Sequence, residues 1–170
     1  MHIRAAVAGD AGPIARVHVQ AWQLAYRGIL PPRVLDALSE QRREVVWAER
    51  IAANARILVS DMDGAVDGWI SFGPSHDDDA TPSDGEVYGL YVAPDCWSKG
   101  IGAALCQEAK TALSGTRFSV ARLWVFEAND RARRFYERQG FTLEPGVRQL
   151  FERDGATAPE VRYCGPLEPN

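Results

Sequence analysis

Apolar side chains recur at the spacing of an α-helix through the first third of the chain. Gly9-Asp10 and Pro13 suit the start of the first helix. The residues that follow at three- and four-residue spacing, on one face of that helix, are Ile14, Val17, His18, Ala21, Trp22 and Ala25. Further helices are predicted at 34–38 and, after the N-cap residue Ser39, through Ile51. This region therefore reads as helical, apart from a short strand predicted at 2–6.

The pattern then changes to the alternation typical of β-strands. Strands are predicted at 56–60, 66–72, 86–92 and 120–126, with a turn at 61–64. A further strand is predicted from Phe141, followed by a hairpin of 150–153 with 161–164. Helices are predicted at 100–113 and 129–139. Strand, helix, strand and helix in succession imply a crossover beside a parallel pair of strands. The predicted class is α+β in an α/β/α arrangement: one mixed, mostly antiparallel sheet with helices on both faces.

Length and charge narrow the classes of function. The 170 residues fit one domain spanning 1–170, since a domain typically holds about 150 residues. Nineteen Lys and Arg against 23 Asp and Glu give a net charge of −4, which disfavours nucleic acid as a partner. The chain contains no apolar run long enough to span a membrane, and its N-terminus lacks the apolar stretch of a signal peptide. We therefore expect a cytoplasmic protein that binds neither nucleic acid nor membrane.

Cysteine and histidine usage gives little support to a metal site or a disulfide framework. Cys96, Cys106 and Cys164 are odd in number and lack metal-type spacing, so we expect reduced thiols. The three histidines are scattered singly. No metal is predicted.

The segment 90–105 places a loop and two glycines between a strand and a helix. Gly100 and Gly102 would let a ligand approach the first amides of the helix, which have no helical partner and favour a phosphate. Lys99 would add a positive charge. A dinucleotide fingerprint fails because Leu105 stands where a third small residue is needed, and no P-loop sequence is present. On these residues alone, a phosphate cradle and a tight packing turn both remain open.

A second segment, 129–141, begins at a predicted helix start. Asn129 and Tyr136 are seven residues apart, so the amide and the phenol share one helix face. They would then face a common ligand. The alternative reading makes Asn129 an N-cap and Tyr136 a core aromatic residue.

Together the two segments resemble the GCN5-related N-acetyltransferase (GNAT) superfamily, whose members use acetyl-CoA. Leu90–Pro94 with Gly100 and Gly102 is similar to its acyl-CoA segment, and Asn129, Ala132, Phe135-Tyr136 and Gly140-Phe141 are similar to its later motif. Trp97 departs from the pattern, because the family usually has Gln or Arg there. The resemblance is specific from Glu86 to Phe141.

The resemblance implies a role for each matching position. The backbone of Tyr91 and Val92 would pair with the pantetheine arm, and the Val92 amide would bind the thioester carbonyl. Asn129 would bind the same arm, Arg131 or Arg133 would lie near the phosphates, and Tyr136 would protonate the departing thiolate. The residues implied to surround the pyrophosphate are Trp97, Ser98, Lys99, Gly100, Ile101, Gly102 and Ala103.

Glu86 is the candidate general base. An amine must lose a proton before it attacks, and a carboxylate can accept that proton directly or through water. The histone-acetylating branch of the superfamily has its catalytic Glu at the same distance before the phosphate segment. Strand alternation places Glu86, Tyr88 and Leu90 on one face. The alternative, a solvated Glu at the edge of a strand, stays open.

Residues outside the two segments concern the acceptor. The resemblance implies that the region of Trp22 and Tyr26 borders the acceptor site, so these residues are candidates to line an aromatic substrate pocket. The alternative makes Trp22 a core residue that Tyr26 covers. His18 reads as a buried histidine with satisfied nitrogens rather than a catalytic one. The acidic loop 77–79 with Asp84 reads as solvated, and attraction of a cationic amine is the alternative.

These observations predict an enzyme that transfers acetyl from acetyl-CoA to a primary amine of a small molecule or peptide, by direct attack in a ternary complex. The alternative is a non-catalytic acyl-CoA-binding sensor on the same fold. Generic nucleotide binding is disfavoured by the failed fingerprints. The resemblance also suggests a homodimer, with the 161–164 strand as an edge that pairs between chains.

Overall fold

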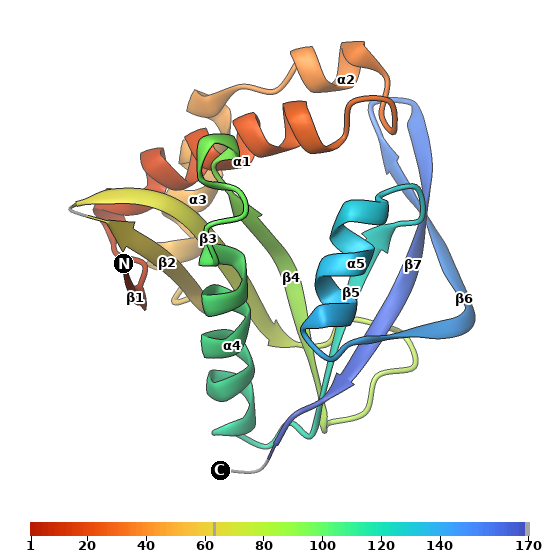
Figure 1. Ribbon diagram of the computed structural model, residues 1–170. Helices are drawn as coiled ribbons and strands as arrows, with labels where there is room; N and C mark the ends of the chain where they lie inside the picture. The colour runs from red at the N-terminus through yellow and green to blue at the C-terminus, as the bar shows by residue number, and fades with distance from the viewer. Residues whose placement is uncertain (63, 169–170) are drawn as a thin grey trace.

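The computed structural model describes residues 1–62 and 64–168 as one seven-stranded sheet with helices on both faces (Figure 1). Asp63, part of the predicted turn at 61–64, lies outside the described residues. The elements in chain order are β1 (His2–Ala5), η1 (Ala8–Asp10), α1 (Ala11–Ala25), α2 (Pro32–Asp36), α3 (Glu40–Ala52), β2 (Ile57–Met62), β3 (Ala65–Pro74), β4 (Asp84–Val92), η2 (Pro94–Cys96), α4 (Ile101–Ser114), β5 (Val120–Phe126), α5 (Asp130–Arg138), β6 (Thr142–Arg153) and β7 (Ala156–Pro166). The predicted α+β class is confirmed.

The strands lie in the order β1-β2-β3-β4-β5-β7-β6. Strands β4 and β5 are parallel, and every other neighbouring pair is antiparallel. Helix α4 makes the crossover that a parallel pair requires. The prediction that residues 161–164 form an edge is wrong, because β7 lies between β5 and β6 and pairs with both. The edges of the sheet are β1 and β6.

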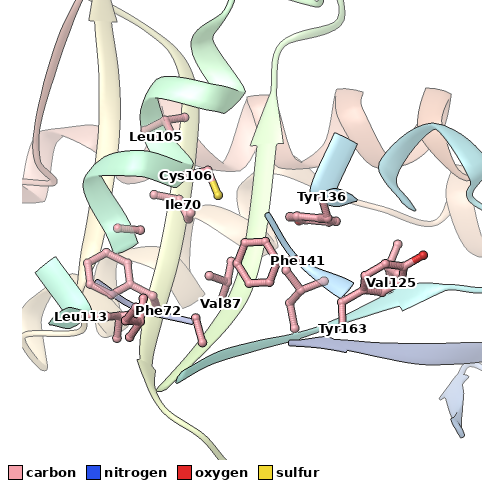
Figure 2. Packing of buried hydrophobic residues seen from close by; sticks show 14 of the residues in the cluster. Ile70, Phe72, Val87, Leu105, Cys106, Leu113, Val125, Tyr136, Phe141 and Tyr163 are labelled. Atoms are coloured by element: carbon pink, nitrogen blue, oxygen red, sulfur yellow. The ribbon is translucent and has the colours of Figure 1, made fainter. Parts of the chain in front are cut away.

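The two faces of the sheet carry different helices. Helices α4 and α5 lie in front of the sheet in Figure 1, and α1 and α3 lie behind it. Figure 2 shows the core on the first face, where Leu105 and Cys106 of α4 pack over Ile70, Val87 and other strand residues. On the other face α1 and α3 pack against β2 and β3 through a second cluster. Burial of both faces is what holds this layered arrangement together.

One glycine allows α4 to approach the sheet closely. A Cβ atom at Gly68 of β3 would lie 3.1 Å from side-chain atoms of both Ile101 and Leu105. Any larger residue would push the N-terminal end of α4 away from the sheet. Gly68 therefore helps to set the position of the helix start that follows the candidate phosphate loop.

The helix signals near the N-terminus are partly confirmed. Ser39 caps α3, because its Oγ accepts a hydrogen bond from the Arg42 amide. Asp10 precedes α1 but makes no capping bond to that helix. Its carboxylate instead binds the Arg4 guanidinium and the Val7 amide.

A β-bulge interrupts β4. The pairing with β3 passes from Ser71–Gly89 to Phe72–Val87, which leaves Tyr88 as the extra residue. Val87 and Leu90 therefore both pack on the face that α4 covers, and Glu86 lies on the opposite face. The predicted common face of Glu86, Tyr88 and Leu90 is wrong for Leu90, because the bulge shifts the alternation by one residue.

Candidate active site

A cavity of about 620 Å³ opens where β4 and β5 separate. The two strands pair only from Asp84–Val120 to Val87–Leu123, and beyond that point β4 has no strand neighbour on this side. The cavity has two walls. The motif wall consists of Val92, Cys96–Ser98, Gly100–Ala103, Asn129, Arg131, Ala132, Phe135 and Tyr136. The aromatic wall consists of Trp22, Tyr26, Glu86, Tyr88, Tyr91, Trp124, Phe126, Gln149, Phe151 and Glu160.

The motif wall includes free amides at the start of α4. Gly100 caps this helix in the left-handed conformation, with φ of +83°, and the first helical bond is that of the Ala104 amide to the Gly100 carbonyl. The amides of Ile101, Gly102 and Ala103 therefore have no partner within the helix. All three residues line the cavity. The N-terminal end of a helix of this length favours an anion such as a phosphate.

Trp97 closes the loop in place of the family's usual Gln or Arg. Its indole Nε1 donates a 2.8 Å hydrogen bond to the Val92 carbonyl, which ties the loop to the end of β4. The Arg131 guanidinium lies over the same ring, 3.6 Å from its centroid. Trp97 therefore positions the end of β4 and the Arg131 cation at the cavity. It contributes through these two contacts and lacks the polar side chain of the usual Gln or Arg.

Two predicted phosphate contacts do not line the cavity. Arg133 donates from Nε to the Tyr163 hydroxyl at 3.1 Å and from Nη1 to the Glu127 carbonyl at 3.1 Å. These contacts tie α5 to the sheet, and of the two candidates only Arg131 lines the cavity, so a phosphate contact stays a prediction for Arg131. Lys99 is exposed, with Nζ 4.0 Å from the Cys96 sulfur.

The end of β4 presents unpaired backbone groups to the cavity. The Ala93 amide donates to the Asp67 carbonyl at 2.7 Å, on the β3 side. Amides alternate along a strand, so those of Leu90 and Val92 point away from β3, toward the space between β4 and β5. Leu90 lies two residues before Val92 in β4, deeper in the cavity. The sequence did not predict its amide as a hydrogen-bond donor. Two donors are thus available, Leu90 and the predicted Val92. The predicted pairing of the Tyr91 backbone with the pantetheine arm is wrong, because the Tyr91 amide points toward β3.

Asn129 and Tyr136 both line the cavity. Asn129 is the N-cap of α5, since its Oδ1 accepts from the Ala132 amide at 3.1 Å, so the capping reading is confirmed. Tyr136 packs against Phe135 and Phe141, and its hydroxyl makes no hydrogen bond to any described residue. Burial raises the pKa of Tyr136, which keeps the phenol protonated near neutral pH.

Glu86 is buried, with 9% of its surface exposed, and lines the cavity from the start of β4. Its carboxylate accepts hydrogen bonds from the His76 amide at 2.9 Å and from Ser75 Oγ at 3.2 Å. Burial is the main reason that the pKa of Glu86 is raised, and these two hydrogen bonds oppose the shift. A raised pKa and a place in the cavity are what a general base requires. The solvated alternative is therefore wrong.

The aromatic wall is assembled from distant parts of the chain. The hydroxyls of Tyr26 and Tyr91 lie 2.8 Å apart, and Tyr26 packs edge-on against Trp22 and Phe126. Glu160 of β7 faces the same cavity and accepts a hydrogen bond from Gln149 Nε2 at 2.8 Å. Trp22 and Tyr26 were predicted here. The residues that were not identified from sequence are Trp124, Phe126, Gln149, Phe151 and Glu160, because no local motif marks them.

The acidic loop between β3 and β4 is partly solvated and partly paired with arginines, since Asp78 and Asp79 are exposed and Asp77 is half-buried. Asp77 and Asp79 bind the Arg162 guanidinium, at 3.0 Å and 2.7 Å, and Asp79 also binds Arg122 at 2.9 Å. The Trp124 indole donates to Asp77 at 2.8 Å. The prediction of a solvated loop therefore holds for Asp78 and Asp79 but is wrong for Asp84, which is buried and pairs with Arg122. The pairing of Asp77 and Asp79 with arginines disfavours the alternative, attraction of a cationic amine. The network fixes the loop whose residues hold Glu86.

His18, Cys106 and Cys164 do not line the cavity, and Cys96 lines it beside Trp97 and Ser98. His18 is buried among Trp22, Trp47, Trp69 and Tyr91, and burial lowers its pKa to about 3. Neither ring nitrogen has a hydrogen-bond partner among the described residues, so the expected satisfied histidine is wrong on that point. The three cysteines are free thiols. Within residues 1–62 and 64–168, no group of His, Cys, Asp or Glu is arranged to hold a metal ion.

Comparison with known proteins identifies the class. The model of the acetyltransferase (GNAT) family matches residues 20–141. An uncharacterized N-acetyltransferase of Bacillus subtilis, YuaI, is 31% identical over 164 residues, covering 96% of this chain and 92% of that protein. The probable N-acetyltransferase Rv2775 of Mycobacterium tuberculosis is 28% identical over 169 residues, with the same two coverages. The chain belongs to the GNAT family and is an acetyltransferase.

Solved structures share the fold. The PaiA N-acetyltransferase of Thermoplasma acidophilum, solved in complex with coenzyme A, has a TM-score of 0.75 at 20% identity and covers 97% of this chain and 98% of its own. YncA, a putative acetyltransferase of Salmonella typhimurium solved with acetyl-CoA, has a TM-score of 0.72 at 22% identity, covering 99% and 95%. In the part of the chain that the structure describes, no helix is long and apolar enough to cross a membrane.

Proposed function

We propose that the protein transfers the acetyl group of acetyl-CoA to a primary amine of a small molecule or peptide, by direct attack in a ternary complex. The observation that carries the proposal is the cavity between β4 and β5, with free helix-start amides at one end and buried Glu86 at the other. Relatives of this chain are named N-acetyltransferases, and two structures of the same fold hold coenzyme A or acetyl-CoA.

The motif wall fits acetyl-CoA by its own chemistry. The amides of Ile101, Gly102 and Ala103 suit the pyrophosphate, and Arg131 over Trp97 supplies a nearby cation. Gly102 keeps this surface open, since a Cβ there would already lie 3.4 Å from the Phe135 ring. The free amides of Leu90 and Val92 suit the acyl and pantetheine parts, with Leu90 at the deeper acyl position. Bound acetyl-CoA supplies the activated acyl group.

The chain's own residues then handle the protons and the developing charge. Glu86 accepts one proton from the acceptor ammonium, directly or through water, so that the neutral nitrogen attacks the carbonyl carbon. The Leu90 amide stabilises the negative charge that develops on the carbonyl oxygen. A C–N bond forms and the C–S bond breaks, and Tyr136 donates a proton to the departing sulfur. The products are the N-acetyl amine and coenzyme A, with one proton released overall.

A covalent route through cysteine has less support. Cys106 is buried, and burial raises the pKa of its thiol to about 11, so very little thiolate exists near neutral pH. Cys96 lines the cavity at the phosphate end, away from Glu86. No histidine in the described structure contacts either thiol as a base would.

The test is a calorimetric titration with acetyl-CoA, followed by an amine screen. The wild type is expected to bind in the micromolar range, and Gly102→Glu is expected to abolish binding because it places a carboxylate in the anion cradle. Gly9→Glu is the matched control, since Gly9 is exposed and nothing lies within 4 Å of its Cβ position. No binding at millimolar acetyl-CoA would overturn the proposal. Binding without transfer to any amine, peptide N-termini included, would point to an acyl-CoA sensor instead.

Three further expectations stay predictions: a single domain, a cytoplasmic location and a homodimer. All seven strands belong to one sheet, which favours the single domain. Pairing between copies is expected at the β6 edge, where Leu143 and Leu150 are exposed. Sedimentation of the wild type and of Leu150→Lys tests the dimer.

A further inference from the structure

The aromatic wall contains a second carboxylate that the proposed reaction does not use. Glu160 lines the cavity on β7, beside Phe126 of β5 and Gln149 of β6. Its only side-chain partner among the described residues is the neutral Gln149 amide, and it forms no ion pair with a described cation. A half-buried carboxylate without a cation is costly unless a ligand supplies one.

Glu160 and Glu86 stand at different places on the same face of the sheet. Glu86 pairs with Arg122 of β5, whereas Glu160 pairs with Phe126, four positions further along that strand. At about 3.3 Å per residue and about 4.8 Å between strands, this register separates the two Cα atoms by roughly 16 Å. One ligand that extends along the cavity can therefore approach both carboxylates.

Aromatic rings surround the Glu160 end of the cavity. Tyr26 and Phe151 pack edge-on against Phe126, and Trp22 packs against both Tyr26 and Phe151. All four rings line the cavity. Rings grouped around a carboxylate bind an ammonium ion, since the ring faces attract a cation and the carboxylate neutralises it.

The cations near the cavity do not occupy this position. Arg131 and Arg138 line the cavity from α5, which contacts Tyr163 on the face of β7 opposite the one that carries Glu160. Arg43 and Arg153 lie over Trp22, at 5.8 Å and 5.3 Å, but neither lines the cavity. Glu160 is therefore available to pair with a cationic ligand in the cavity.

We propose that the acceptor is an α,ω-diamine or a related amine with a second cationic group, whose reacting nitrogen lies near Glu86 while its distal ammonium is held by Glu160 and the rings of Trp22, Tyr26, Phe126 and Phe151. This inference rests on the proposed function. It excludes acceptors whose reacting amine is followed by a carboxylate, because an anion at the distal position would be repelled by Glu160. The apolar rings favour a methylene chain between the two nitrogens.

The first test compares α,ω-diamines of four, six and eight carbons with the corresponding monoamines. The best diamine is expected to exceed its monoamine at least tenfold in kcat/KM. Glu160→Gln is expected to reduce that ratio at least tenfold. Glu152→Gln, an exposed residue of β6 outside the cavity lining, is the charge-matched control and should keep the wild-type ratio. Equal kcat/KM for diamines and monoamines, or an unchanged ratio in Glu160→Gln, would overturn the inference.

The second test does not depend on transfer. Hexamethonium cannot be acetylated, so its binding to protein saturated with coenzyme A is measured by calorimetry, against hexyltrimethylammonium. The inference expects at least tenfold tighter binding of hexamethonium, and loss of this difference in Glu160→Gln but not in Glu152→Gln. The same affinity for both ligands would overturn it, even if transfer to simple amines succeeds. Failure of all transfer with the expected hexamethonium result would overturn the proposed function alone.

Discussion

The two walls of the cavity are built in different ways. The motif wall comes mostly from two continuous segments and uses backbone amides at the start of α4 and the end of β4. The aromatic wall takes single side chains from α1, β4, β5, β6 and β7. Backbone recognition depends on where glycine permits close approach, so it leaves a local pattern in sequence. Side-chain recognition depends on tertiary contacts and leaves none.

The largest expected effect tests whether the general base is a residue of the aromatic wall. Glu86→Gln should lower kcat about 100-fold, because general base catalysis typically contributes at least that much. Binding of acetyl-CoA should not change, since Glu86 is outside the motif wall. Steady-state kinetics and calorimetry measure the two quantities. A decrease of less than threefold would assign the base to another group.

The pH profile sharpens this prediction. Glu86 must be deprotonated to act as a base. Because its pKa is raised, the acidic limb of the kcat–pH profile lies at higher pH than an ordinary glutamate would give. Activity should therefore rise with pH through that limb. Glu86→Gln should lose the limb, whereas Glu152→Gln should keep it.

The next effect concerns the stability of the core behind the aromatic wall. The pKa of His18 is about 3 in the folded protein against 6.5 in the unfolded chain, because burial disfavours the charged ring. The unfolded state therefore binds an extra proton between these values, and stability falls as pH decreases from 6.5. Between pH 7 and pH 5 this loss is about 2 kcal/mol.

His18→Phe should remove that part of the acid sensitivity, as measured by denaturant unfolding at both pH values. His2→Phe, at an exposed position in β1, is the control. If His18→Phe loses as much stability between the two pH values as the wild type, the histidine is not held neutral by its surroundings.

A smaller effect is expected on the opposite side of the cavity. Tyr136→Phe should lower kcat about tenfold through loss of the proton donor to sulfur. The hydroxyl makes no hydrogen bond to a described residue, so the melting temperature should change little. An unchanged kcat, under conditions where chemistry limits the rate, would assign thiolate protonation to water.

The smallest effect tests the departure at Trp97. Trp97→Phe removes the hydrogen bond to the Val92 carbonyl but keeps a ring beneath Arg131, so acetyl-CoA should bind about threefold more weakly. Trp97→Ala removes both contacts, and about tenfold weaker binding is expected. Equal affinities in the two variants would show that the ring does not position Arg131.

The same contrast explains what the sequence predicted and what it did not. The fold class, the helix that follows Gly100 and the N-cap at Asn129 follow from local patterns, and the structure confirms them. Local patterns do not reveal a one-residue bulge such as the one at Tyr88, which depends on pairing with β3. They also do not show that arginines of β5 and β7 pair with Asp77 and Asp79 of the acidic loop. They also do not place Glu160 in the cavity, because that position depends on the order of the strands in the sheet.

The position of β7 has a consequence for the order in which the protein matures. This strand follows all the others along the chain, yet it lies between β5 and β6. During synthesis the motif wall is complete before β7 emerges, while β5 keeps an unpaired edge and the cavity still lacks Glu160. A nascent chain is therefore expected to acquire its cofactor surface first and its acceptor surface last, and the edge of β5 is exposed to wrong partners in the interval.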